Sequence, residues 1–191
     1  MIITAARVLE LNEEFNLITN LCEREQNNPE GVGFDIRFEE VYKLVGDGFL
    51  GITERKTPDI ELVASVANGD KDITLKPGDY FLIKTPEIIS SPEVKIDVEN
   101  NGNKFYVVPQ IFPRSTLQRC GLMLRATKTD PGYTGPLTFG IFNAGNSTIR
   151  LELNSRIANV VFQTATGELS RSYSGQWQGG RVAATKKETQ N

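Results

Sequence analysis

Short segments in which apolar and polar residues alternate follow one another from about residue 31 to residue 165, and this pattern most constrains the fold. Phe34, Ile36 and Phe38 are separated by single polar residues, a period of two that indicates a strand with one buried face. Further strands are expected at residues 72–75, 80–83, 104–112, 137–141, 149–153 and 156–162. Many short strands, roughly 8–12 residues apart, are typical of an all-β sandwich or barrel.

The N-terminal segment lacks this alternation. Residues 1–30 are predicted to be mostly helical, because apolar residues in Ala5–Leu11 and Phe15–Cys22 recur at mixed spacing. Asn27-Asn28-Pro29-Glu30-Gly31 then ends the segment, since proline and glycine stop helices. We expect a helical N-terminal extension that precedes the β domain.

Two further segments interrupt or follow the strands. Residues 46–72 are charged and contain glycine, and we interpret them as an excursion between strands that would accommodate a hairpin. From Gly167 onward the chain is poor in aliphatic residues, and alone it would not bury enough apolar surface to become ordered. The expected organisation is an N-terminal extension (1–30), a β domain (31–166) and a flexible C-terminal arm (167–191).

The 191-residue chain contains no histidine, and this excludes several classes of enzyme. Ser-His-Asp and Cys-His nucleophile systems need an imidazole, as does a zinc deaminase site with a histidine ligand. Cys22 and Cys120 are the only thiols, too few for a four-ligand zinc site, and we expect both to be free. Catalysis would depend on carboxylates, tyrosines, cations and a hard metal.

The charge and hydropathy of the chain bear on its partners and location. The net charge is −3, so no general basic field would recruit nucleic acid, and a polyanion would need local cations. No apolar run approaches the roughly 20 residues that span a bilayer. Met1–Arg7 lacks the features of a signal peptide. We therefore expect a cytoplasmic protein with neither nucleic acid nor membrane as partner.

Two neighbouring motifs combine cations, hydroxyls and a carboxylate. The run from Pro113 to Arg119 contains Arg114, Ser115, Thr116 and Arg119, and guanidinium and hydroxyl groups suit a polyphosphate. Asp130 begins the turn Asp130-Pro131-Gly132, and a carboxylate held on a turn suits positioning or deprotonating a water. Together they predict phosphate-ester chemistry on a nucleotide, although each motif alone is also common on protein surfaces.

Four motifs in order carry a resemblance to a known superfamily. They are Gly33-Phe34-Asp35-Ile36-Arg37, Pro113-Arg114-Ser115-Thr116-Leu117-Gln118-Arg119, Asp130-Pro131-Gly132-Tyr133-Thr134-Gly135 and Arg156-Ile157-Ala158-Asn159-Val160-Val161-Phe162, followed by a glycine-rich aromatic tail. With this order the chain resembles the dUTPase and dCTP deaminase superfamily over roughly residues 30–181. The short segment between Arg119 and Asp130 is most similar to an archaeal-type dUTPase. Met1-Ile2-Ile3 and Leu75–Asp79 resemble the deaminase branch.

The resemblance implies an architecture and a ligand. It implies a mainly β, distorted barrel or jelly roll that assembles as a homotrimer, with active sites at subunit interfaces. It also implies dUTP or another pyrimidine deoxynucleoside triphosphate as substrate, together with Mg²⁺.

The resemblance also implies roles for single residues. Asp130 matches the aspartate that orients and activates the attacking water, and Tyr133 matches the aromatic that packs on deoxyribose and excludes a 2′-hydroxyl. Asp35 matches an acidic position tied to the Mg²⁺ environment or to intersubunit hydrogen bonding. Substrate-binding positions for the phosphate chain are Arg114, Ser115, Thr116, Arg119 and Asn159, the last standing where many members have glutamine.

The tail from Tyr173 to Arg181 resembles the mobile C-terminal arm of the superfamily. An aromatic of the arm would stack on the base, first Trp177 and next Tyr173. Amides at Gly179-Gly180 would approach phosphates closely, and Arg181 would pair with the γ-phosphate. Trp177 could instead dock on the barrel as a fixed anchor.

Gly140 distinguishes the branches of the superfamily. Deaminases carry a glutamate ten residues after the aspartate of the turn, and here that position is Gly140, which has no side chain to move a proton. Gly140 could also be a bulge or a close-packing glycine. We therefore favour dUTP hydrolysis to dUMP and pyrophosphate. The alternatives are dCTP deamination, alone or coupled to hydrolysis, and a non-catalytic nucleotide-binding protein of the same fold.

Overall fold

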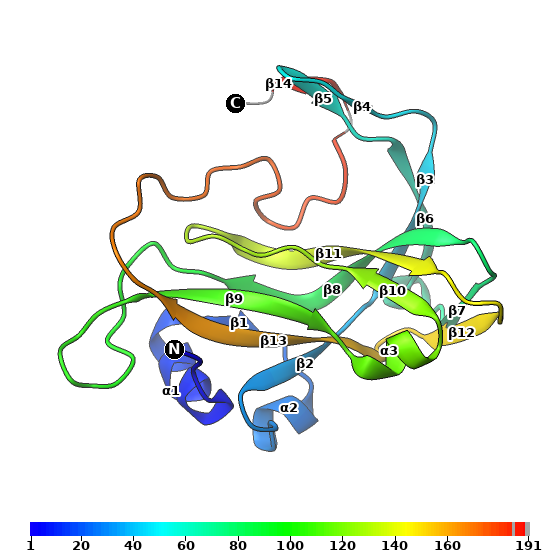
Figure 1. The fold of residues 1–191 in the computed structure, drawn as a ribbon. Helices are drawn as coiled ribbons and strands as arrows, with labels where there is room; N and C mark the ends of the chain where they lie inside the picture. Colours follow the sequence, from blue (N-terminus) through cyan, green and yellow to red (C-terminus); the bar gives the residue numbers. More distant parts are fainter. Residues whose placement is uncertain (185, 190–191) are drawn as a thin grey trace.

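The computed structural model describes residues 1–184 and 186–189, and it is built mainly from antiparallel strands (Figure 1). The largest sheet has the order β10-β11-β8-β3-β6, and β1 pairs with β8 off this path. Its strands are β1 (Ile18–Thr19), β3 (Glu40–Val45), β6 (Asp59–Ser65), β8 (Tyr80–Ser90), β10 (Leu122–Arg125) and β11 (Thr134–Asn143). This sheet carries the residues around Asp130.

Three smaller sheets complete the strand set. The three-stranded sheet β2-β13-β9 contains β2 (Gly33–Arg37), β9 (Tyr106–Pro113) and β13 (Arg156–Ala165). A two-stranded sheet pairs β7 (Asp72–Leu75) with β12 (Ile149–Glu152), and a third sheet joins β4 (Phe49–Leu50), β5 (Glu54–Lys56) and β14 (Glu188–Thr189). The predicted mainly β fold is confirmed. The sheets in the described residues are open paths of strands that pack in a jelly-roll-like arrangement.

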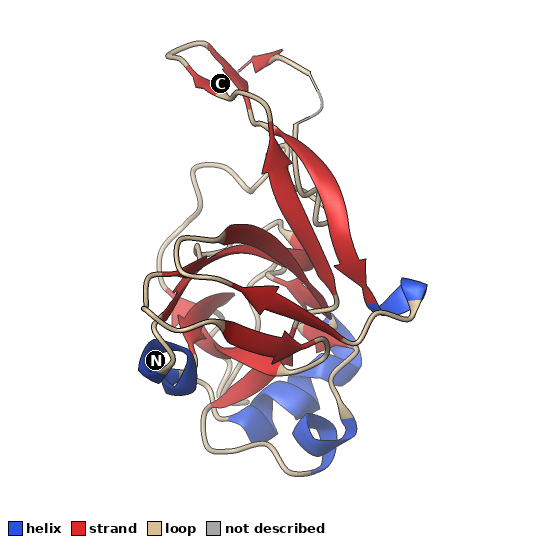
Figure 2. Ribbon diagram, turned by 90° about the vertical axis from the view of Figure 1, so that its right-hand side faces the viewer, coloured by secondary structure: helices blue, strands red, loops and turns tan. Residues whose placement is uncertain are grey.

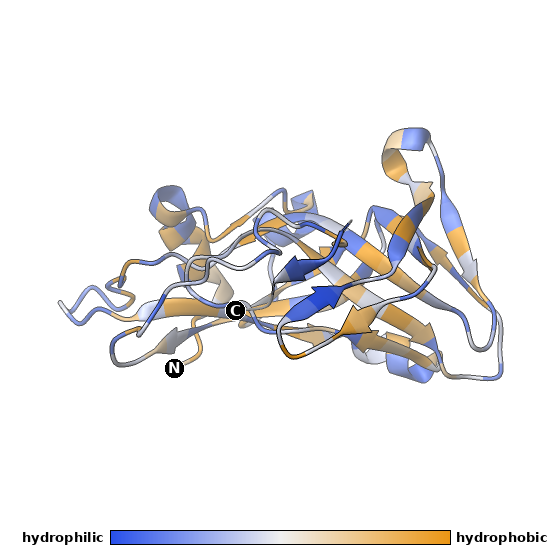
Figure 3. Cartoon of the chain, turned by 90° about the horizontal axis from the view of Figure 1, so that it is seen from above, coloured by the Kyte–Doolittle hydropathy of each residue, from blue (hydrophilic) through white to orange (hydrophobic). Residues whose placement is uncertain are grey.

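One continuous core lies between the sheets. Alternate residues along the strands point inward, as the period of two predicts, and polar and apolar residues alternate along the strands in Figure 3. The largest fully buried side chains include Phe34, Ile36, Phe162, Ile83 and Ile141, from both main sheets. Burial of these side chains is the main favourable contribution to folding.

The N-terminal segment belongs to this core. Helix α1 (Ala5–Phe15) is capped by Thr4, whose side chain accepts from the amide of Arg7, and it buries Val8 and Leu11. Before the helix, Ile2 bridges to Gln163 of β13. The N-terminal segment therefore completes the domain.

The helix predicted over Phe15–Cys22 is wrong. Asn16 adopts a left-handed conformation with φ 48°, which ends α1. Leu17 and Ile18 are then buried, and Ile18–Thr19 pairs with β8 as strand β1. Burial beside the sheet outweighs the local helical pattern here. The helical pattern resumes only in α2 (Glu23–Asn27).

The excursion at residues 46–72 contains the predicted hairpin. Strands β3 and β6 pair with each other and extend away from the body, with the β4–β5 hairpin at their far end (Figure 2). The helical turn η1 (Val66–Asn68) leads from β6 towards β7. Strand β14, near the end of the chain, pairs with β5.

Within the residues that the structure describes, we find no helix long and apolar enough to cross a membrane.

Candidate active site

Two cavities meet at Asp130. The first, of about 390 Å³, is bounded by the start of β11 and by the C-terminal arm, and its lining includes Tyr133, Leu137 and Trp177. The second, of about 320 Å³, is lined by polar groups of the arm and by Arg55. Asp130 lines both cavities, so one carboxylate lies between a mainly apolar and a mainly polar space.

Backbone contacts hold the turn that carries Asp130. The amide of Tyr133 donates to the carbonyl of Asp130 over 3.1 Å, and the amide of Gly132 donates to Ser91 over 2.7 Å. Gly132 has φ 102°, a conformation that favours glycine. The Asp130 side chain remains 49% exposed and forms an ion pair with Lys128. The turn is thus fixed, and its half-exposed carboxylate belongs to a residue that lines both cavities.

Tyr133 presents a ring to the first cavity. It is buried, and its hydroxyl donates to the carbonyl of Pro136 over 2.7 Å. Burial, with a smaller effect of Tyr173, raises the pKa of Tyr133 to about 12. The Tyr133 and Tyr173 rings meet edge to face, with centroids 5.7 Å apart. The hydroxyl is therefore engaged, and the ring is the part available to a ligand.

The C-terminal arm lies along the turn and β11 of the same chain. The amide of Tyr173 donates to Pro131 over 2.7 Å, and the Gln178 side chain donates to Gly132 over 2.9 Å. The amide of Gly179 donates to Thr134 over 3.1 Å. The arm therefore forms one wall of the first cavity, which Tyr173, Trp177 and Gly180 line.

The glycine pair of the arm allows close packing on β11. A Cβ on Gly180 would lie 2.7 Å from Cδ of Pro136, and Gly180 has φ 76°. Its amide donates to the carbonyl of Trp177 over 3.2 Å. In this conformation the amides of Gly179 and Gly180 thus donate to carbonyls of the same chain, whereas the sequence predicted that they approach phosphates.

Two guanidinium groups lie near Trp177. Their central carbons are 5.6 Å (Arg55) and 5.7 Å (Arg181) from the ring centroid, within the range of a cation–π contact. Arg181 also pairs with Glu188, so its predicted pairing with a γ-phosphate would compete with that contact. Trp177 lines the first cavity and is also held by the protein, and its stacking on a base stays a prediction, as does that of Tyr173.

The arginine–serine run lies at the other end of β11. Ser115, Thr116 and Arg119 are exposed on helix α3 (Ser115–Arg119). The helix leads into β10, whose Leu122 pairs with Asn143 at the far end of β11. Ten residues of strand separate that end from the Asp130 turn, about 30 Å at 3.3 Å per residue. Figure 1 shows α3 and the start of β11 on opposite sides. One chain therefore does not bring the two predicted motifs together.

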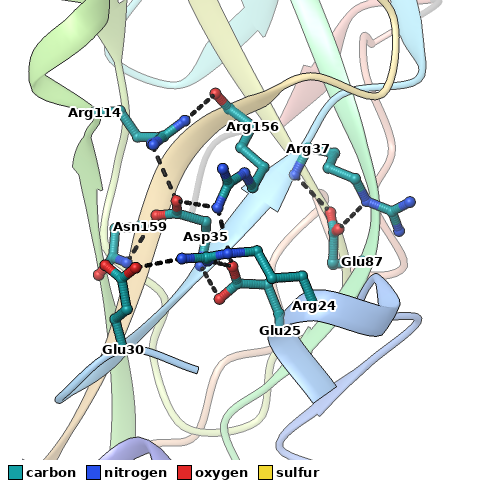
Figure 4. A network of polar contacts seen from close by, with 9 residues as sticks. All are labelled: Arg24, Glu25, Glu30, Asp35, Arg37, Glu87, Arg114, Arg156 and Asn159. Carbon is teal, nitrogen blue, oxygen red and sulfur yellow. Dashed lines mark hydrogen bonds and ion pairs between the residues drawn. The ribbon is translucent and has the colours of Figure 1, made fainter. Parts of the chain in front are cut away.

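Asp35 is the centre of a polar network (Figure 4). Its Oδ2 lies 3.1 Å from Nε of Arg114 and 3.2 Å from Nη1 of Arg156, and its Oδ1 accepts from Asn159 over 3.0 Å. Glu25, only 1% exposed, accepts from the amide of Asp35 and pairs with Arg156. The network fixes Arg114 at the start of α3. Glu25 was missed from the sequence, because an acidic residue on a short polar helix gives no signal of burial.

The same network bears on the predicted Mg²⁺ site. Both carboxylate oxygens of Asp35 are occupied by cations or an amide, so Asp35 does not fit a direct metal ligand. Its ion pairs and hydrogen bonds lie within this chain, and the intersubunit hydrogen bonding implied for it stays a prediction. In residues 1–184 and 186–189 there is no group of three or more metal-ligating side chains.

A second buried carboxylate supports β2. Glu87 is fully buried and accepts from the amide of Arg37 over 3.0 Å and from its Nε over 2.7 Å (Figure 4). Burial raises the pKa of Glu87 above its usual value and outweighs the opposite effect of Arg37. This pair connects β2 of the smaller sheet to β8 of the larger one.

Gly140 is a close-packing glycine. It lies opposite Leu82 of β8 and Arg125 of β10, and a Cβ there would lie 2.8 Å from Cζ of Tyr80. The irregularity in the β11–β8 pairing falls between Pro136 and Thr138, so the bulge interpretation is wrong for Gly140. The position that carries glutamate in deaminases is here filled by a tyrosine ring from the neighbouring strand.

Comparison with known proteins identifies the family. A family model described as dCTP deaminase-like matches residues 2–165. The chain belongs to this family. The resemblance seen in the motifs is thereby confirmed.

Relatives in the family carry both kinds of name. A protein of Aeropyrum pernix named probable deoxyuridine 5′-triphosphate nucleotidohydrolase is 31% identical over 147 residues, 77% of this chain and 82% of that protein. A dCTP deaminase of Thermococcus kodakarensis is 30% identical over 115 residues, 60% of this chain and 66% of that protein.

A solved structure supports the fold. The crystal structure of 2′-deoxycytidine 5′-triphosphate deaminase from Agrobacterium tumefaciens superposes with a TM-score of 0.61 at 15% identity. The match covers 86% of this chain and 48% of that chain, so this chain spans about half of it.

Proposed function

We propose that this protein hydrolyses dUTP to dUMP and pyrophosphate. The observation that carries the proposal is the place of Asp130, half-exposed on a fixed turn where an apolar and a polar cavity meet. The apolar cavity suits a base and a deoxyribose, and the polar one suits a phosphate chain. Gly140, which has no side chain, argues against deamination.

The proposed reaction needs one positioned water. The Asp130 carboxylate would hold this water in line with the α-phosphorus and accept its proton as the oxygen–phosphorus bond forms. The bond from the α-phosphorus to the bridging oxygen then breaks, and pyrophosphate leaves. Mg²⁺ bound to the phosphates would offset their charge.

Tyr133 is proposed to select the sugar. Its hydroxyl is bonded to Pro136 and its ring is buried, so the ring is held rigidly beside the first cavity. A rigid ring against C2′ of the sugar would leave no space for a 2′-hydroxyl. Discrimination between deoxyribose and ribose would therefore depend on steric contact with the ring.

We further propose a homotrimer in which a neighbouring protomer supplies the phosphate-binding run. Arg114, Ser115, Thr116 and Arg119 lie at the far end of β11 from Asp130 within one chain. Their side chains on α3 are largely exposed, and Arg114 is oriented by Asp35. A copy that placed its α3 beside the Asp130 turn would complete the site with cations.

One assay tests the proposal. Purified protein is offered dUTP or dCTP with Mg²⁺, and pyrophosphate and ammonia are measured separately. We expect pyrophosphate from dUTP and little ammonia from dCTP. Ammonia from dCTP would favour deamination, the activity named for the Thermococcus kodakarensis relative, and binding without either product would favour a non-catalytic role.

Asp130→Asn tests the assigned residue. The variant should lose about 10²-fold or more of its turnover, since loss of a positioned base typically costs that much, while its unfolding transition stays close to the parent's. Asp47→Asn, a change at an exposed loop carboxylate, is the matched control. Equal pyrophosphate release by the Asp130 variant and the control would overturn the assignment.

A further inference from the structure

The excursion at residues 46–72, called the inserted hairpin below, is bound to the C-terminal arm. The amide of Ala184 donates to Oγ1 of Thr57 over 2.8 Å, and Nζ of Lys187 lies 2.6 Å from a carboxylate oxygen of Glu54. Strand β14 pairs with β5, with Glu188 opposite Arg55. Figure 1 shows the end of the chain rising from the body to meet the hairpin. The hairpin and the arm thus form one assembly that lines both cavities.

Arg55 contacts the part of the arm that lines the cavities. Its Nε donates to Oε1 of Gln176 over 2.6 Å, and its Nη2 donates to the same oxygen. The Arg55 guanidinium also lies 5.6 Å from the Trp177 ring centroid. Two adjacent arm residues are therefore bound by one side chain of the hairpin.

Arg55 also lines the polar cavity beside Asp130, and two roles could follow from that place. It could bind a phosphate directly, or it could act through the arm. Two of its N–H donors are used by Gln176 and its guanidinium lies against Trp177, so these contacts favour the second role.

We propose that Arg55 is a positioning residue that holds the arm over the cavities before any nucleotide binds. A glycine-rich arm loses much conformational freedom when it becomes ordered, and ordering it in advance removes that cost from substrate binding. The inserted hairpin thus acts as a latch for the arm. The kinetic consequence rests on the proposed dUTP hydrolysis, whereas the latch itself is testable without substrate.

The single tryptophan makes the latch measurable. Trp177 is the only tryptophan of the chain, so its fluorescence reports the arm alone. In the free protein, Arg55→Ala should raise the acrylamide quenching constant of Trp177 about two- to threefold and should speed tryptic cleavage within the arm. Lys56→Ala is the matched control, because Lys56 pairs within its own hairpin with Asp59, and it should change neither.

Gln176→Ala provides an independent variant on the arm side. It should raise the quenching constant as Arg55→Ala does, and the double variant should be no worse than Arg55→Ala, as expected for two residues that act through one contact. Arg55→Lys keeps the charge but loses the planar pair of donors. Its quenching constant should lie between those of the parent and Arg55→Ala. If the rises in the quenching constant caused by the two alanine substitutions add fully in the double variant, the latch is overturned.

Kinetics separate the latch from a direct phosphate contact. With dUTP, Arg55→Ala should raise KM about tenfold and leave kcat within about twofold, because the arm can still be ordered by the bound substrate. A raised KM with unchanged quenching in the free protein would overturn the proposal and assign Arg55 to the phosphates. If the parent releases no pyrophosphate while quenching responds as expected, the proposed function fails and the latch stands.

Discussion

The ring of Tyr80 occupies the space into which a side chain at Gly140 would project, with its Cζ 2.8 Å from the place of a Cβ. Tyr80 begins β8 and Gly140 lies on the neighbouring strand β11. A Cβ at position 140 therefore meets the end of the Tyr80 side chain in its present rotamer. A glutamate at position 140, as in the deaminase branch, would require the Tyr80 ring to move.

This relationship predicts a coupling between the two positions. Gly140→Ala should lower the free energy of unfolding by about 1 kcal/mol, the low end of the overpacking range, because the exposed Tyr80 side chain can move part of the way. In a Tyr80→Ala background the same substitution should cost clearly less, since the ring is gone. Urea unfolding of the four proteins of this double-mutant cycle measures the coupling, and equal costs in both backgrounds would show that the ring can turn away freely.

The glycine pair of the arm predicts a contrast between two neighbouring substitutions. Gly179 and Gly180 have φ of 72° and 76°, so alanine is strained to a similar extent at both. Only at Gly180 would the new Cβ meet Pro136, whereas at Gly179 it would meet nothing within 4 Å. Gly180→Ala should therefore expose Trp177 to acrylamide more than Gly179→Ala and raise KM for dUTP further. Equal effects of the two would place the cause in backbone strain alone.

The engaged hydroxyl of Tyr133 predicts that its ring matters more than its oxygen. Tyr133→Phe removes the hydrogen bond to Pro136, which should cost about 1 kcal/mol of stability, and should leave most of the dUTP turnover. Tyr133→Leu should raise hydrolysis of UTP relative to dUTP, because a flexible side chain replaces a rigid one. The ratio of kcat/KM for the two nucleotides measures this, and an unchanged ratio in the leucine variant would argue against sugar selection by the ring.

The buried Glu87 predicts a pH dependence of stability. Its pKa is raised in the folded protein, so the folded state binds this proton more tightly than the unfolded chain does. The associated stability is present below the unfolded pKa of about 4.3 and is lost as the pH rises through the folded pKa. The neutral variant Glu87→Gln escapes this loss, so its stability relative to the parent should increase with pH across that window and then level off.

Chemical denaturation of Glu87→Gln and of the parent from pH 4 to pH 8 tests the sign of this pH dependence. A relative stability of Glu87→Gln that decreases with rising pH would mean that Arg37 outweighs burial at this site.

Many of the strands follow from the sequence. In a strand with one buried face, successive residues alternate between apolar and polar, so residues two positions apart share a face. Strands β2, β7, β9, β12 and β13 lie where alternation or apolar runs predict them. Strand β10 was missed, since Leu-Met-Leu-Arg is short and its two exposed positions include a methionine. The local pattern at Leu17–Ile18 predicts helix, because only burial beside β8 distinguishes this segment as a strand.

By itself the sequence determined the fold class and the superfamily, and it predicted the residue types of the candidate site, including the missing carboxylate at position 140. These depend on local periodicity and on short motifs. Tertiary structure decided which of these residues meet: Asp130 and α3 lie at opposite ends of β11, and Arg55 contacts Gln176 across 121 residues of chain. Such contacts are set by sheet order and by the path of the chain between sheets, and no local pattern of side chains specifies them.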